Sequence, residues 1–192
     1  MAALLNTRRI GLMCQPMSNL PKSGWVWAAD NGCFSEKWDE ARWLAWLDKD
    51  LPRAGCLFAV VPDVVADHEA TVERFDVWHD VVRSRRYPVA FVGQDGADVA
   101  TVPWDRMDAF FVGGSTEWKM SHHAFDLAHE AKARGKWVHV GRVNSQRRYC
   151  RWADHADSCD GTFLAFGPKK NAVRLTGWLD HHEANPSLWG VS

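Results

Sequence analysis

Residues 56–96 read CLFAVVPDVVADHEATVERFDVWHDVVRSRRYPVAFVGQDG, and this stretch contains a complete strand–helix–strand unit. Its two ends, Cys56–Val61 and Val89–Val92, are short runs rich in apolar and β-branched residues, as is typical of buried strands. Between them, Asp67 is placed to cap a helix. The apolar residues of that helix recur at helical spacing and share one face: Val72, Phe75, Trp78 and Val82. A parallel sheet covered by helices is therefore expected.

The same alternation continues in both directions along the chain. Helices are expected from Ser35 to about Leu51, from Ser121 to Gly135, and from Asn144 or Ser145 onward. The expected strands lie near Ile10–Met13, Trp25–Ala29, Cys56–Val61, Val89–Val92, Ala109–Val112, Trp137–Val140 and Gly161–Ala165.

This order of elements predicts an α/β fold in which residues 1–192 form a single domain, a compact (β/α)8 barrel of the TIM type. Seven strands are visible, and an eighth could lie near Val173–Leu175. A barrel of this kind usually needs about 200 residues or more, whereas the chain has 192. A trimmed or incomplete barrel is therefore the alternative.

The composition argues against several classes of protein. No run of about 18 apolar residues occurs, and the first residues lack the apolar core of a signal peptide, so a cytoplasmic protein with no membrane partner is expected. The net charge is −1, so any nucleic acid must be bound by local basic clusters. The five cysteines form no CxxC pair, and the adjacent histidines lack the spacing of a helical zinc site. No metal and no cofactor are expected.

Polar residues and glycines directly follow most of the expected strands. In a parallel barrel these strand ends open on one face, so residues far apart in the sequence are expected to converge there. Each of them alone is explained by a helix cap or a tight turn. Together, carboxylates, an amide and bare backbone suit the edge of a purine. The residues concerned are Asp30, Asp63, Gln94, Gly113, Gly114, Gly141 and Arg142.

Six short segments extend this pattern in order along nearly the whole chain. They are Asp30–Phe34 (DNGCF), Val61–Asp63 (VPD), Val92–Gly96 (VGQDG), Phe111–Ser115 (FVGGS), Val140–Gly141 (VG) and Asp157–Gly161 (DSCDG). In sequence and order they resemble the active-site segments of the tRNA-guanine transglycosylases, which exchange a guanine base in a nucleic acid. Each segment is short and unspecific by itself, and the resemblance rests on their common order and barrel-like spacing.

The resemblance implies a role for each matching residue. Asp160 would be the nucleophile that attacks the sugar, and Asp30 would be the general acid/base. Phe34 would stack on the base. The other implied base-binding residues are Asp63 and Gln94, which would read the purine edge, and Gly113, Gly114, Val140 and Gly141, whose segments would face the base with the Gly114 N–H toward the purine O6.

The chain departs from the family in ways that bear on the substrate. The family's zinc site of three cysteines and a histidine has no counterpart, most insertions that embrace tRNA would not fit in this length, and Cys33 and Val140 stand where glycine and methionine are common. A shortened, zinc-free relative resembles the phage and bacterial enzymes that place 7-deazaguanine derivatives in DNA. The expected partners are therefore DNA and a 7-deazaguanine base such as preQ0, in the cytoplasm of a bacterium or a phage-infected host.

A target base must leave its stack to reach such a pocket, and contacts to the phosphate backbone can offset that cost. The residues expected to make these contacts follow the sixth strand: Arg142, Arg147, Arg148 and Arg151. Three alternatives stay open, namely the same exchange on tRNA, a non-catalytic subunit that binds nucleic acid or a base, and a glycosylase in which water replaces the incoming base. Many relatives dimerise, so a homodimer is a further expectation.

Overall fold

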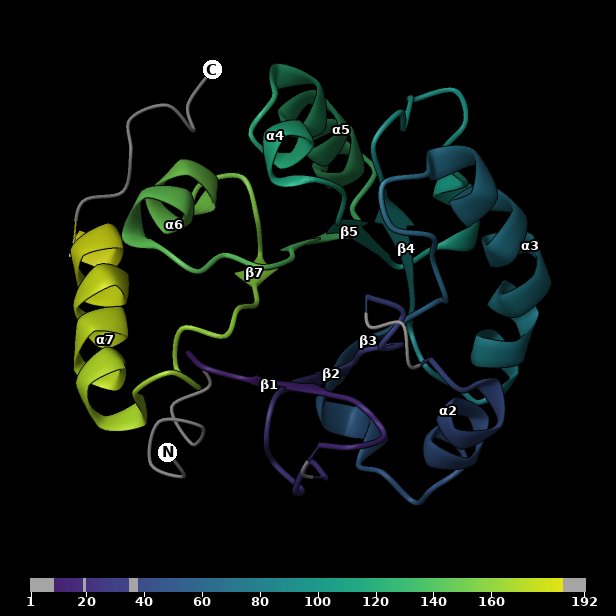
Figure 1. Ribbon diagram of the computed structural model, residues 1–192, viewed down its shortest axis with the longest axis horizontal. Helices are drawn as coiled ribbons and strands as arrows, with labels where there is room; N and C mark the ends of the chain where they lie inside the picture. The colour runs from purple at the N-terminus through teal and green to yellow at the C-terminus, as the bar shows by residue number, and fades with distance from the viewer. Residues whose placement is uncertain (1–8, 19, 35–37, 185–192) are drawn as a thin grey trace.

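The computed structural model describes residues 9–18, 20–34 and 38–184. Its centre is one sheet of seven strands, all parallel, in which each strand pairs with the next one along the chain. Figure 1 shows that the sheet curls into part of a barrel with the helices around its outside. The strands are β1 (Leu12–Cys14), β2 (Trp27–Ala29), β3 (Cys56–Val60), β4 (Val89–Gly93), β5 (Ala109–Val112), β6 (Trp137–Val140) and β7 (Ser158–Cys159).

The two faces of the sheet bury different sets of side chains, because successive strand residues point to opposite faces. One set packs with the helices in the larger core and includes Trp27, Phe91 and Phe110. The other set lies on the concave side and consists mainly of strand residues: Ala28, Phe58, Val60, Ala90, Val92 and Ala109. The concave interior is therefore filled by side chains and forms the floor beneath the strand ends.

The helices of the described residues begin largely where the sequence predicts. Asp67 accepts a hydrogen bond from the Ala70 N–H, Ser121 from that of Ala124, and Ser145 from that of Arg148. Gly135, with φ +70°, follows α5 as predicted. The helices are α2 (Glu40–Leu47), α3 (His68–Ser84), α4 (Thr116–Lys119), α5 (His122–Ala133), α6 (Gln146–Trp152) and α7 (Pro168–Ala184), with 3-10 turns at Arg53–Gly55 and Trp104–Arg106.

Two predicted helix boundaries need comment. The expected cap Ser35 lies outside the described residues, and α2 begins instead after Asp39, whose carboxylate accepts the Arg42 N–H. The four-residue helix α4 was not predicted, because so short a segment carries no periodic pattern. None of the described helices is long and apolar enough to cross a membrane.

The end of the predicted barrel is wrong in two places. The seventh strand is Ser158–Cys159, because the Asp157 and Asp160 N–H groups bond to Val138 and Val140, whereas the predicted strand Gly161–Ala165 is a turn. The predicted eighth strand, Val173–Leu175, lies within α7. Helical spacing prevails there over a locally strand-like run, because it brings Trp178 against Tyr149 of α6 at 6.2 Å between ring centroids.

Helix α7 occupies the side of the molecule where an eighth strand would close the ring. It lies beside α6 in Figure 1. Its far end is tied to the start of β1, since Arg9 bonds to Asp180 at 2.8 Å and to Glu183 at 3.0 Å. The described residues therefore form an open, seven-stranded sheet flanked by α7, and β7 makes no pairing with β1.

Candidate active site

Three carboxylates lie at the carboxyl ends of strands. Asp30 directly follows β2, Asp63 follows β3 and Asp160 directly follows β7. The pKa of Asp30 is raised to about 6, mainly because the carboxyl is removed from water and also because Asp160 and Asp63 place negative charge near it. The hydrogen bond from the Gly32 N–H, at 3.3 Å, opposes part of this rise. The fold therefore brings the three predicted carboxylates together, and Asp30 is suited to exchange a proton near neutral pH.

Only one of the two carboxylate oxygens of Asp160 is hydrogen-bonded within the described residues. Its Oδ1 accepts the Arg142 backbone N–H at 3.1 Å and lies 3.3 Å from Nε2 of His139. Its Oδ2 has no hydrogen-bond partner among the residues that the structure describes, and the side chain is 27% exposed. A carboxylate fixed in this way is oriented for attack through its second oxygen.

His139 is the centre of a buried polar chain behind Asp160. Its ring is 4% exposed and lies against Phe58 and Phe111, at centroid distances of 5.1 and 4.7 Å. Its Nδ1 is 2.7 Å from Oγ of Ser158, which accepts the indole N–H of Trp137 at 2.8 Å. A carboxylate oxygen accepts, so Nε2 carries a ring proton and donates it to Asp160, and the Ser158 hydroxyl can donate to Nδ1. His139 therefore holds Asp160 in place.

The family resemblance implies base exchange, and replacing His139 by Phe is then expected to slow that reaction about 10- to 100-fold with little change in KM. The aromatic packing is kept, but Asp160 loses one of two donors and Ser158 loses its partner. His139→Gln is the matched variant, because its amide N–H can again donate to Asp160 and restore part of kcat. Steady-state kinetics on both variants, with thermal melting to verify folding, make the measurement. A larger KM with unchanged kcat in His139→Phe would argue against this positioning role.

The Asp63 carboxylate accepts hydrogen bonds from two buried side-chain amides. Asn31 donates to Oδ1 at 2.7 Å and Gln94 donates to Oδ2 at 2.6 Å, and these amide residues are 3% and 2% exposed. Burial raises the pKa of Asp63, and the two amide hydrogen bonds oppose that rise. Each carboxylate oxygen keeps a further lone pair for an outside donor. The arrangement fixes the plane of Asp63 and leaves it able to accept from a purine N1–H or exocyclic amine.

The structure uses Gln94 and Gly114 differently from what the family resemblance implies. Gln94 Oε1 accepts the N–H groups of Ala66 and Gly114, each at 2.9 Å, so the Gly114 N–H is engaged within the protein. Val140 is 1% exposed and belongs to the core shared with the helices, which keeps its side chain away from the three carboxylates. In this structure, Gln94 fixes the orientation of the Asp63 carboxylate by a hydrogen bond from its amide N–H.

Close packing explains the glycines near the strand ends. A Cβ at Gly141 would come within 2.7 Å of the Phe111 ring and 3.4 Å of Asp160 Oδ1, and one at Gly113 would lie 2.5 Å from Val92. Gly114 has φ +65°, which favours glycine. These positions let neighbouring strand ends approach one another next to Asp160.

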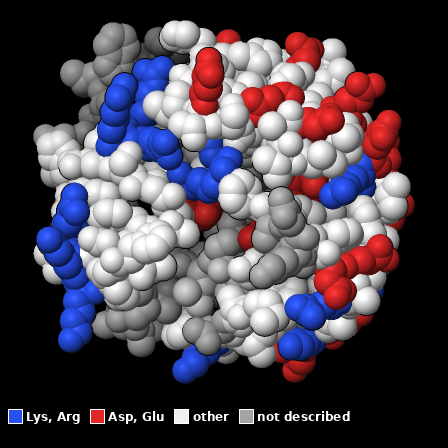
Figure 2. All heavy atoms as spheres, viewed as in Figure 1, with Lys and Arg blue, Asp and Glu red and all other residues white. Residues whose placement is uncertain are grey.

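Phe34 and Arg142 meet at the rim of the site. The Arg142 guanidinium lies 4.4 Å from the centroid of the Phe34 ring, and Phe34 is 65% exposed. Of the other predicted backbone-binding arginines, Arg148 donates to the Arg142 carbonyl at 3.4 Å, while Arg151 covers the Phe125 ring of α5 at 4.5 Å. Arg147 lies with Arg151 beside Met120 and Cys150. Figure 2 shows Lys and Arg atoms gathered over α6, next to a central hollow with acidic atoms in its depth.

No protein-family model matches the chain, and no curated protein matches it. The carboxylates and their surroundings are therefore what bears on function. Among the described residues no group of three or more His, Cys, Asp or Glu side chains is placed to hold a metal ion.

The sequence analysis assigned no role to three residues of this site: Asn31, Lys119 and His139. His139 could have been found, because it is a polar residue in the apolar strand WVHV, at a position whose side chain points to the concave face. Asn31 stands beside Asp30 but is distinguished only by its contact with Asp63. Lys119 lies in the unpredicted helix α4, where nothing in the sequence indicates burial.

Proposed function

We propose that this chain belongs to the tRNA-guanine transglycosylase superfamily as a trimmed TIM-type barrel, and that it exchanges guanine in DNA for a 7-deazaguanine base such as preQ0. The observation that carries the proposal is the pairing of Asp160, oriented with one open oxygen, with Asp30, whose pKa is raised to about 6. A carboxylate nucleophile beside a carboxyl group that exchanges a proton near neutral pH is what a double displacement at a sugar carbon requires.

The proposed reaction has two displacements. Asp160 Oδ2 attacks C1′ of the target deoxyribose, the bond from C1′ to N9 breaks with its electron pair going to guanine, and protonated Asp30 supplies a proton to the leaving base. The incoming 7-deazaguanine base then gives its N9 proton to Asp30 and attacks C1′ through N9. The bond between C1′ and Asp160 breaks, and the carboxylate is regenerated. The configuration at C1′ is retained.

The surroundings of these two carboxylates suit a guanine-like base. Asp63 is oriented by amides to accept from the N1–H and amine edge that guanine and its 7-deaza analogues share. Phe34 offers an exposed aromatic ring at the rim, and base–aromatic stacking contributes about 1–3 kcal/mol per base. Recognition of that shared edge allows one pocket to release guanine and accept its substitute.

The test is incorporation of radiolabelled guanine or preQ0 into duplex DNA, single-stranded DNA or tRNA, counted in precipitated nucleic acid. Label in DNA is the expected result. Label in tRNA alone would replace the DNA assignment by the tRNA one. Release of free guanine without incorporation would indicate a glycosylase that uses water, and no reaction with any polymer would favour a non-catalytic binding subunit.

A further inference from the structure

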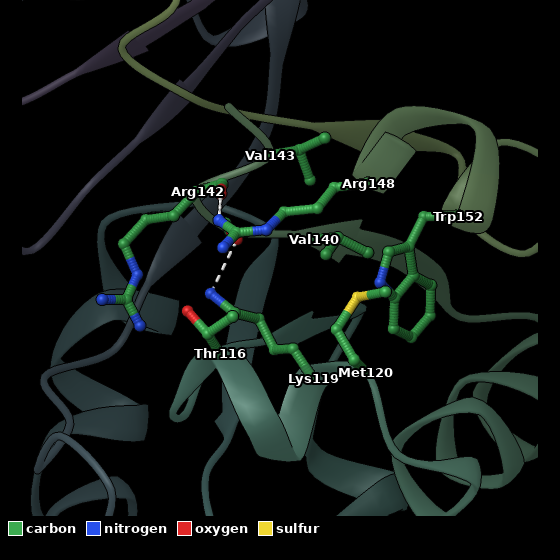
Figure 3. Close-up of a pocket in the computed structure, with 9 residues that line it drawn as sticks. Thr116, Lys119, Met120, Val140, Arg142, Val143, Arg148 and Trp152 are labelled. Atoms are coloured by element: carbon green, nitrogen blue, oxygen red, sulfur yellow. Dashed lines mark hydrogen bonds between the residues drawn. The ribbon is translucent and has the colours of Figure 1, made fainter. Parts of the chain in front are cut away.

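A small pocket lies between α4 and α6, next to Asp160 but separate from the three carboxylates. Its polar lining is entirely cationic or neutral and comprises Thr116, Lys119, Arg142 and Arg148, with Met120 and Trp152 on the apolar side. Figure 3 shows the ends of the four polar side chains facing a common space. The loop that joins β6 to α6 connects this pocket to Asp160, since the Arg142 N–H bonds to Asp160 while the Arg142 side chain lines the pocket.

Lys119 is a buried ammonium group in the wall of this pocket. It is 5% exposed, and its Nζ donates to the Gly141 carbonyl at 2.9 Å. Burial, together with the charges of Arg142 and Arg148, lowers the pKa of Lys119 to about 8, although Asp160 and Asp95 act in the opposite direction. Its position is fixed, because Asp95 binds the N–H and hydroxyl of Ser115, the residue that caps α4.

The charged side-chain ends of the three pocket cations bond to backbone carbonyls in the part of the chain that the structure describes. Lys119, Arg142 and Arg148 donate to the backbone carbonyls of Gly141, Gly114 and Arg142, respectively. Among the described residues none of them forms an ion pair, whereas nine other arginine, lysine and histidine side chains do. Partly buried positive charges of this kind are unfavourable unless an anion compensates them. The pocket is therefore electrostatically complementary to an oxyanion.

The position next to Asp160 indicates which oxyanion this is. The attacked C1′ must lie against the open oxygen of Asp160, and the phosphates that flank a nucleotide are one sugar ring away from its C1′. Gly141 joins the two sites, because its carbonyl accepts from Lys119 and a Cβ added to it would lie 3.4 Å from Asp160 Oδ1. An anion in the pocket thus lies next to the point of attack, where a flanking phosphate of the target nucleotide is expected.

We propose that Lys119, Arg142 and Arg148, with the Thr116 hydroxyl, together bind one backbone phosphate of the nucleotide whose base is exchanged. This assignment rests on the proposed function and adds Lys119 to the residues that contact the substrate. The shared phosphate positions C1′ against Asp160, so the contact is independent of base identity. Arg147 and Arg151, on the Met120 side of α6, are outside this phosphate site.

The test measures how DNA affinity depends on salt, which reports the number of phosphates neutralised. Binding of a fluorescent, guanine-containing single-stranded oligonucleotide is followed by anisotropy at several NaCl concentrations for the wild type, Lys119→Met, Arg148→Met and the triple variant with Arg142→Met. Each single variant is expected to weaken binding about tenfold at low salt. Because the three cations share one phosphate, the triple variant should lose about 0.7 from the slope of log K against log salt. Three separate phosphates would remove about three times as much.

Controls separate this site from general charge effects and from misfolding. Lys170→Met removes an exposed charge of α7 and should leave the slope unchanged. Thermal melting verifies each variant, and if Lys119→Met does not fold, Arg148→Met, whose side chain is only half-buried, carries the test. Inorganic phosphate should compete with the oligonucleotide for the wild type and not for the triple variant, which shows that phosphate is the group recognised.

The outcomes for this site and for the proposed function are distinguishable, because binding is measured without chemistry. An unchanged slope in the folded triple variant would overturn the phosphate site, even if label is incorporated into DNA. A slope that falls threefold more than expected would overturn the shared phosphate. A lost phosphate contact in a protein that incorporates no label would support the site and leave the exchange reaction without support.

Discussion

Asp160→Asn is expected to abolish base exchange, with a rate at least about 10⁴-fold below that of the wild type. The asparagine carbonyl can still accept from Arg142 and His139, so the fold and DNA binding are preserved, but the amide cannot form the glycosyl ester. Incorporation of labelled guanine measures the loss. A second readout is the covalent complex, which should appear on a denaturing gel when the wild type meets guanine-containing DNA, and should be absent with Asp160→Asn.

The matched control for this variant is Asp157→Asn. Asp157 lies three residues earlier, at the opposite end of β7, where it binds the Val138 N–H and pairs with Lys132. Removing its charge leaves the exchange reaction intact if Asp160 is the nucleophile. Activity retained in Asp160→Asn, or a covalent complex that persists there, would show that another group attacks the sugar.

Asp30→Asn is expected to have opposite effects on activity and stability. Because the pKa of Asp30 is about 6 in the folded state against 3.8 for the free group, its stabilising contribution is complete below the lower value and is lost as the pH rises through the higher one. Above about pH 7, the ionised carboxylate destabilises the fold by about 3 kcal/mol. Asparagine removes this penalty, so urea unfolding should show a more stable variant at pH 8 and little difference at pH 4.

The same substitution should lower the exchange rate about 10²- to 10⁴-fold, because it removes the general acid/base. In the proposed reaction the first displacement needs protonated Asp30 and the second needs its carboxylate, so the pH profile of exchange by the wild type should be bell-shaped with its maximum near 6. Asp30→Asn should lose this maximum. An active variant would show that Asp30 is not the proton donor. A variant no more stable than the wild type at pH 8 would show that burial does not destabilise its ionised form.

Most of the fold could be predicted from local patterns. The six strands from β1 to β6, the caps Asp67, Ser121 and Ser145, and the turn at Gly135 all follow from residue spacing and capping chemistry, which act over a few residues. The end of the barrel could not be predicted in this way. Val173–Leu175 is strand-like by itself, and only packing of α7 against α6, together with the ion pairs of Arg9, selects the helix.

The candidate site also has one part that could be predicted from the sequence and one part that depends on tertiary contacts. The sequence by itself determined that Asp30 and Asp63 follow parallel strands, and parallel pairing brings such ends to one edge. Asp160 precedes the predicted strand Gly161–Ala165, so only the structure, in which β7 is Ser158–Cys159, puts it at the carboxyl end of a strand. Only the tertiary structure decided that Gln94 holds Asp63 from behind, that His139 orients Asp160 through Ser158, and that Lys119 is buried beside two arginines. These features depend on contacts between different strands and helices and on removal from water, and neither is encoded in the spacing of residues along the chain.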